Sequence, residues 1–132
     1  MTIATPTRTF DEIAVVLKAL ADPNRLRILD TLMQGVSCNG ELNEWLGLPP
    51  NLLSHHLRVL KKAGLITSRR DSVDGRWIYY AVDLDAIALW RTWFGDFFDP
   101  DRLQPRCLCG PEGENQTPIT NLNLRVSHVT TN

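Results

Sequence analysis

The stretch from residue 51 to residue 62 carries side chains suited to nucleic acid along one side of a predicted helix. At about 100° per residue, Leu53, Leu57 and Leu60 fall together and predict a buried stripe. Asn and Arg make bidentate contacts with base edges, and Ser or His adds single hydrogen bonds. The pattern predicts a recognition helix whose first polar residues contact bases and whose later basic residues contact phosphates. Its polar side has no carboxylate and consists of Asn51, Ser54, His55, Arg58, Lys61 and Lys62.

A second basic group surrounds a predicted β turn at Asp74-Gly75. Arg69 and Arg70 precede this turn and Arg76 follows it. Basic side chains on a projecting hairpin commonly contact the DNA backbone or the minor groove. We therefore assign these arginines to DNA as well. For His56, which lies beside the leucine stripe, we expect packing rather than DNA contact.

The net charge of −1 hides an uneven distribution. Residues 51–80 hold six basic and two acidic side chains, a local charge of +4, and the rest of the chain sums to −5. A positive region on a nearly neutral small domain indicates a polyanionic partner. The alternative for charge alone is a solvated charged surface.

The elements that position these residues follow from periodicity and from helix boundaries. We predict helices over 10–21, from Pro23 to Gly35, over 39–46, over 50–63 and over 85–98, with β-type runs at 65–70 and 76–82. Ile13, Leu17 and Leu20 lie at helical spacing in the first helix, and Leu26, Leu29 and Met33 of the second are expected to face inward. The predicted fold is mainly α with a small β hairpin, a winged helix–turn–helix. We predict an N-terminal arm over 1–9, one domain over 10–109 and a flexible tail over 110–132.

Composition and motifs exclude several classes of protein. No apolar run approaches the roughly 18 residues that span a bilayer, and the first residues lack a signal-peptide core, so we expect a cytoplasmic protein with no membrane partner. The three cysteines are too few and odd in number for a disulfide scaffold. No phosphate-binding loop, metal-hydrolase motif or nucleophile–base pair is present, and we do not expect an enzyme.

Three segments together resemble the ArsR/SmtB family of small bacterial winged-helix repressors. They are ALADPNRLRIL at 19–29, LPPNLLSHHLRVLKKAGLI at 48–66 and GRWIYYAV at 75–82. The resemblance implies a homodimer formed through the first and last helices. It also implies binding to double-stranded DNA at an imperfectly palindromic operator, and release when an inducer binds.

The family's sensor sites narrow the choice of inducer. The zinc site of the last helix needs histidine, and residues 83–99 contain none. Cys38 matches the first cysteine of the family's arsenic motif, but Gly40 stands at the second. Cys107 and Cys109 are the candidates for the missing ligands. Three thiolates suit trivalent arsenic (arsenite) or antimony, because soft ligands select thiophilic ions. The resemblance implies no organic cofactor.

Several alternatives remain open for the cysteines and for the whole chain. The cysteines are also compatible with other soft metals, organoarsenicals, thiol oxidation or persulfide sensing, or no inducer at all. A protein-interaction module with a vestigial winged helix would show no salt-dependent DNA binding.

Overall fold

The computed structural model describes residues 8–114 and 117–122. Most of the predicted arm over 1–9, and residues 115–116 and 123–132 of the predicted tail, lie outside the described residues. The chain divides into two compact units, residues 1–93 and residues 94–132. The predicted DNA-binding residues and Cys38 belong to the first unit, and the other two cysteines belong to the second.

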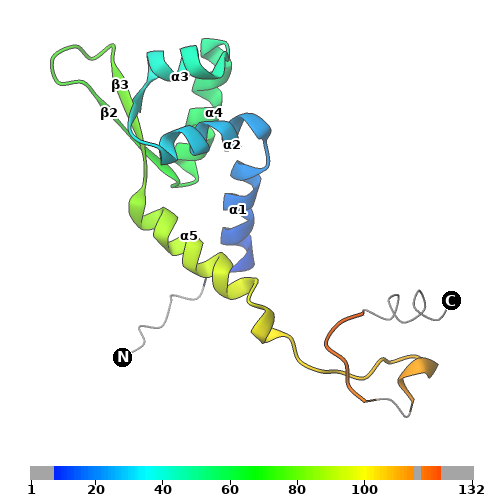
Figure 1. Cartoon of the computed structure of the whole chain (residues 1–132). Helices are drawn as coiled ribbons and strands as arrows, with labels where there is room; N and C mark the ends of the chain where they lie inside the picture. Colours follow the sequence, from blue (N-terminus) through cyan, green and yellow to red (C-terminus); the bar gives the residue numbers. More distant parts are fainter. Residues whose placement is uncertain (1–7, 115–116, 123–132) are drawn as a thin grey trace, which may run out of the picture. The chain divides into compact units, whose positions relative to one another are not determined.

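The first two helices begin where polar caps satisfy their free amides (Figure 1). Helix α1 (Phe10–Leu20) starts at Thr9, which forms a reciprocal capping box with Glu12. Helix α2 (Pro23–Met33) starts at Asp22, whose carboxylate accepts hydrogen bonds from the next two free amides. The predicted break between these helices at Asp22-Pro23 is confirmed.

The next two helices form the helix–turn–helix. Helix α3 (Asn39–Leu46) ends at Gly47, whose φ of 65° is left-handed and therefore favours glycine. Helix α4 (Pro50–Lys62) begins at the predicted proline pair. Gly64, with φ of 79°, follows it and turns the chain towards the sheet.

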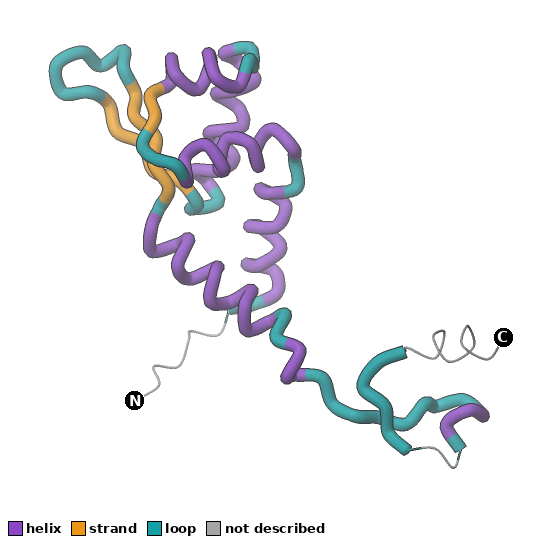
Figure 2. Tube along the Cα trace, viewed as in Figure 1, coloured by secondary structure: helices purple, strands orange, loops and turns teal. Residues whose placement is uncertain are grey.

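The strands form one antiparallel sheet, coloured orange in Figure 2. Strands β2 (Ile66–Arg70) and β3 (Ile78–Val82) are the predicted hairpin, which projects from the helices (Figure 1). The sequence did not predict strand β1 (Ser37–Cys38), because two residues are too short for an alternating pattern. Strand β1 pairs with β3, so the order is β1-β3-β2 and the sheet has three strands.

The core lies between the helices and the inner face of the sheet. Leu53, Leu57 and Leu60 of α4 are buried in it, as predicted. The inward assignment of Leu26 and Met33 was wrong, since these side chains are 50% and 54% exposed, whereas Leu29 packs against the core as predicted. Of the residues at helical spacing in α1, Ile13 is buried and Leu20 packs against the core, but Leu17 is 48% exposed. Both helices carry apolar residues on more than one side, and the core takes a stripe of each that overlaps the predicted one only in part. That stripe consists of Ile13, Val16 and Ala19 on α1, and Ile28 and Leu32 on α2.

Helix α5 (Leu84–Phe97) follows β3, and none of its residues is fully buried in the single chain. Within the first unit it packs on the core through Ile87 and Trp90. The described part of the second unit contains two short 3₁₀ helices, η1 (Pro100–Arg102) and η2 (Pro111–Gly113). It also contains one antiparallel bridge between Arg106 and Ile119. Among the described residues, no helix combines the length and apolar character needed to cross a membrane.

Candidate DNA-binding surface and cysteine positions

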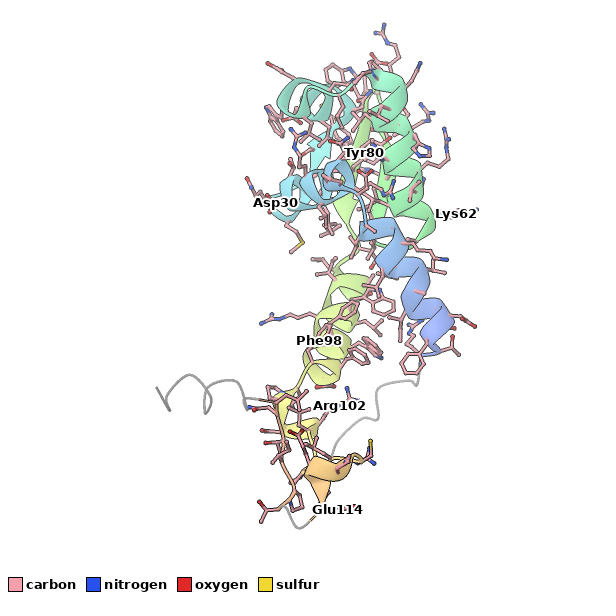
Figure 3. The ribbon with its side chains drawn as sticks, turned by 90° about the vertical axis from the view of Figure 1, so that its right-hand side faces the viewer. Asp30, Lys62, Tyr80, Phe98, Arg102 and Glu114 are labelled. Atoms are coloured by element: carbon pink, nitrogen blue, oxygen red, sulfur yellow. The ribbon has the colours of Figure 1, made fainter. Side chains whose placement is uncertain are left out.

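Helix α4 presents the predicted polar residues together on its solvent side. The six predicted side chains are all exposed, and the leucines on the other side of the helix are buried. Lys62 lies in the last turn of the helix (Figure 3). The exposed side is therefore available to a ligand as large as duplex DNA, and its fixed charges are all positive. It consists of Asn51, Ser54, His55, Arg58, Lys61 and Lys62.

His56 does not belong to that surface, as predicted, because it is only 4% exposed. Its Nδ1 atom lies 3.2 Å from Nη1 of Arg25 on α2. A guanidinium can only donate, so Nδ1 accepts this hydrogen bond and carries no proton. Arg25 also donates to the carbonyl oxygens of Ala19 and Lys18 in the last turn of α1. Through these hydrogen bonds, the Arg25 side chain links α1, α2 and α4.

The basic residues of the hairpin are held by local contacts. Lys61 of α4 donates to the Ser68 hydroxyl on β2 at 2.6 Å, which joins the helix to the sheet. Arg70 donates to the carbonyl oxygen of Gly75 at 2.6 Å. Arg76 forms an ion pair with Asp74, with Nη2 and Oδ2 2.8 Å apart. Strands β2 and β3 and the loop over 71–77 between them form the wing. Arg69 and Arg70 lie at the end of β2, and Arg76 lies in the loop at the tip of the wing.

A carboxylate of the hairpin orders the loop between β2 and β3. Asp71 accepts a hydrogen bond from the Tyr79 hydroxyl at 2.7 Å and two more from the amides of Val73 and Asp74 at 2.9 Å. The Tyr79 hydrogen bond, followed by those amides, lowers the pKa of Asp71. The same bond is the first cause of a raised pKa for Tyr79. Arg69 lies over the Tyr79 ring, with its guanidinium carbon 5.9 Å from the ring centre.

The cysteines occupy two kinds of environment. Cys38 is buried, precedes the first residue of α3 and donates its amide to Glu41 Oε1 at 3.0 Å. That amide, and then the Cys38 thiol, lower the pKa of Glu41. Cys107 and Cys109 are exposed in the second unit, beside the bridge between Arg106 and Ile119. In the described ranges, no three His, Cys, Asp or Glu side chains are gathered as a metal site.

Sequence reasoning missed Arg25, Tyr79 and Asp71 as residues that position the surface. Arg25 lies inside the segment that carries the family resemblance, but its partner His56 is 31 residues away. Aromatic residues in strands more often pack than contact a ligand, and the sequence does not show that Asp71 is the partner of Tyr79. Only the alternation of Tyr79 with Tyr80 along the strand carried a signal that one of them faces away from the core.

The described geometry agrees with a known family of regulators. A family model for bacterial regulatory proteins of the arsR family matches residues 22–68, which run from the start of α2 into β2. The transcriptional repressor SdpR of Bacillus subtilis is 33% identical over 84 residues, which are 64% of this chain and 90% of that protein. The chain belongs to the ArsR family.

Further relatives of this ArsR-family chain agree with the assignment, which confirms the resemblance predicted from the sequence. The arsenical resistance operon repressor of Staphylococcus xylosus is 38% identical over 63 residues, 48% of this chain and 61% of that protein. A homodimeric winged helix–turn–helix DNA-binding domain of Mycobacterium bovis, solved by NMR, is 30% identical with a TM-score of 0.55. The match covers 70% of this chain and 83% of that one. The chain is thus an ArsR-family transcriptional regulator with a winged helix–turn–helix fold.

Proposed function

We propose that this protein is a homodimeric transcriptional repressor that binds an imperfectly palindromic DNA operator through α4 and the wing. The observation that carries the proposal is the solvent side of α4, which is exposed, free of carboxylates and anchored from behind by buried leucines. A helix of this kind fits the major groove of B-DNA, where its N-terminal residues reach base edges.

The residues have different roles in this proposal. Asn51, Ser54 and His55 lie nearest the start of α4 and contact bases. Arg58, Lys61 and Lys62 lie further along and neutralise phosphates. The wing arginines Arg69, Arg70 and Arg76 contact the adjacent backbone or minor groove.

We assign the dimer interface to α1 and α5. Both helices leave large apolar side chains in solvent, with Phe10 and Leu84 each 75% exposed in the single chain. Exposed apolar surface of this kind marks interaction sites. The homodimeric state of the similar M. bovis domain supports a dimer, in which two copies bind two half-sites.

We assign release from DNA to trivalent arsenic or antimony bound by the thiolates of Cys38, Cys107 and Cys109. Sulfur ligands select soft ions, and a trivalent metalloid binds three of them. The similarity to an arsenical resistance repressor supports this inducer. Each bound thiol loses its proton, so the affinity for the inducer rises with pH. We place the protein in the cytoplasm, where thiols stay reduced.

Fluorescence anisotropy with labelled duplexes tests the proposed function. The full chain is titrated onto a palindromic site from the upstream region of its own gene and onto a scrambled duplex, at several salt concentrations. We expect two chains per palindrome and tighter binding there than to the scrambled duplex by a factor of about 10³ or more. Equal affinity for both duplexes, or binding independent of salt, would contradict DNA-specific repression.

The same titration distinguishes the candidate inducers. Arsenite, antimonite, cadmium, zinc and peroxide are added in turn to the preformed complex. Release by arsenite and antimonite supports the three-thiolate assignment. Release by peroxide alone would favour a thiol-redox repressor of the same fold, and release by cadmium alone would favour another soft metal.

A further inference from the structure

A thiol, a phenol and a guanidinium lie in one row across the sheet. Cys38 of β1 pairs with Tyr79 of β3, and Tyr79 pairs with Arg69 of β2. Residues directly opposite in antiparallel strands place their side chains on the same face, so these three share a face. It is the outer face, because the neighbouring Tyr80 packs against the core.

The row continues into the wing through Tyr79. Its hydroxyl donates to one oxygen of Asp71, and the other oxygen accepts the amides of Val73 and Asp74. Asp74 in turn holds the Arg76 side chain through both of its carboxylate oxygens. The path from Cys38 to the wing tip therefore begins with the cross-strand pair of Cys38 and Tyr79 and continues through hydrogen bonds from Tyr79 to Arg76.

The two ends of Tyr79 have very different surroundings. Cys38 is only 6% exposed. The residues around Cys38 must therefore move when a ligand larger than a proton binds to its sulfur. On the outer face, an open trough of about 490 Å³ is lined by Tyr79 and, among others, by Val36, Thr67 and Ala81. The trough gives the Tyr79 ring space into which it can turn away from Asp71.

We propose that Tyr79 is a positioning residue that couples the ligand state of Cys38 to the order of the wing. With Cys38 free, the hydroxyl of Tyr79 holds Asp71 and the wing loop is set for DNA. With an inducer on Cys38, the ring turns into the trough, Asp71 loses its anchor and the wing loop loosens. Linkage requires that the inducer then binds more weakly to the DNA-bound form. This inference rests on the proposed release of DNA through Cys38.

A competing path leads from Cys38 through Glu41 into α3, which packs beside α4. Glu41 accepts the Cys38 amide at 3.0 Å, so a ligand on Cys38 also disturbs the start of α3. If this path carries the coupling, removing the Tyr79 hydroxyl leaves release unchanged. Removing the Tyr79 hydroxyl therefore distinguishes the two paths.

The test compares Tyr79→Phe with Tyr80→Phe in the full chain. Both substitutions remove one hydroxyl from adjacent residues of β3 and keep the ring. The measurement is the ratio of operator Kd with and without arsenite. This ratio reports coupling, and a purely structural loss of DNA affinity cancels from it.

For the wild type we expect arsenite to raise Kd about 5- to 150-fold, the usual range of allosteric coupling. Tyr80→Phe should match the wild type within about two-fold, and Tyr79→Phe should lower the ratio by about five-fold or more. A Tyr79→Phe ratio equal to that of the wild type overturns the proposal. No response of the wild type to arsenite overturns the arsenic assignment itself, and this inference with it.

Amide NMR supplies a second readout of the wing. Arsenite should shift the Val73 and Asp74 amide signals of the wild type and of Tyr80→Phe, because their acceptor Asp71 moves. In Tyr79→Phe these signals should already lie near their shifted positions before arsenite is added. Signals that do not move in the wild type while arsenite releases DNA would overturn the role of Tyr79.

Discussion

Nδ1 of His56 on α4 accepts a hydrogen bond from Nη1 of Arg25 on α2, with 3.2 Å between the two nitrogens. Nε2 of the same ring lies 3.9 Å from Oδ1 of Asp22, the residue that caps α2. His55, the preceding residue, is exposed. Two adjacent histidines on one helix therefore have opposite environments: His56 is buried, and His55 is exposed on the side that we propose contacts DNA.

Replacing each histidine with alanine should show that only His56 contributes to the stability of the fold. His56→Ala removes the acceptor of Arg25 Nη1 together with a buried ring, and it should lower the free energy of unfolding by about 1–3 kcal/mol. His55→Ala should change it by less than about 0.5 kcal/mol, as is usual for surface positions. Urea denaturation of both variants measures the difference. Equal losses of stability would refute the division between the two residues.

Arg58→Ala tests the phosphate contacts of α4. Loss of one phosphate contact should weaken binding to every duplex and reduce the slope of log K against log salt by about 1. Lys18→Ala on α1 removes one positive charge elsewhere and should leave the slope as it is. Anisotropy at several salt concentrations measures both slopes, and an unaltered slope for Arg58→Ala would rule out the phosphate contact.

Asn51→Ala tests the base contacts at the start of α4. A bidentate contact with one base discriminates by about 1–3 kcal/mol, so its loss should relax the preference at one base pair per half-site. Binding to a set of operators with single substitutions measures this preference. Ser72→Ala, in the exposed loop of the wing, serves as a control that should keep the full preference. Uniform weakening across the set would show that Asn51 does not contact a base.

The hydrogen bond between Tyr79 and Asp71 should stabilise the fold only within a defined pH range. The pKa of Asp71 is lowered from its ordinary 3.8, so its contribution is present above pH 3.8 and is lost as the pH falls through the lowered value. The pKa of Tyr79 is raised from 10.0, so its contribution is present below pH 10.0 and is lost as the pH rises through the raised value. The stability difference between the wild type and Tyr79→Phe should be constant between these limits and shrink outside them.

Urea denaturation across the pH range measures that difference. Tyr80→Phe is the matched control, because Tyr80 donates to no carboxylate among the described residues and burial is the first cause of its raised pKa. If the free energies of unfolding of the wild type and Tyr79→Phe differ by the same amount from acid to alkaline pH, the hydrogen bond does not contribute as proposed.

The helices and the buried side of α4 were predictable because their signals are local. Prolines, glycines and capping residues set the helix ends, and three leucines at helical spacing determine which side of α4 is buried. Strand β1 was not predictable, because pairing with β3 defines it more than its own two residues do. The contacts of Tyr79 and Arg25 also escaped, since each depends on a partner that the fold brings close.

The inward sides of α1 and α2 were predicted only in part, for a related reason. Leu17, Leu26 and Met33 have the apolar character of core residues, and the helical period alone does not say which of two apolar stripes the core takes. For α1, the exposed stripe fits a surface that a second copy covers. Sequence patterns therefore located the exposed polar side of α4 better than the inward sides of α1 and α2, because charge marks only one side of α4.

The cysteine variants test the central claim most directly. Cys38→Ser, Cys107→Ser and Cys109→Ser are compared with the wild type by anisotropy on the palindromic operator, with and without arsenite. We expect all three variants to bind DNA with wild-type affinity and none to be released, because a trivalent metalloid needs three sulfur ligands. If all three variants still leave the operator when arsenite is added, the three-thiolate switch is wrong.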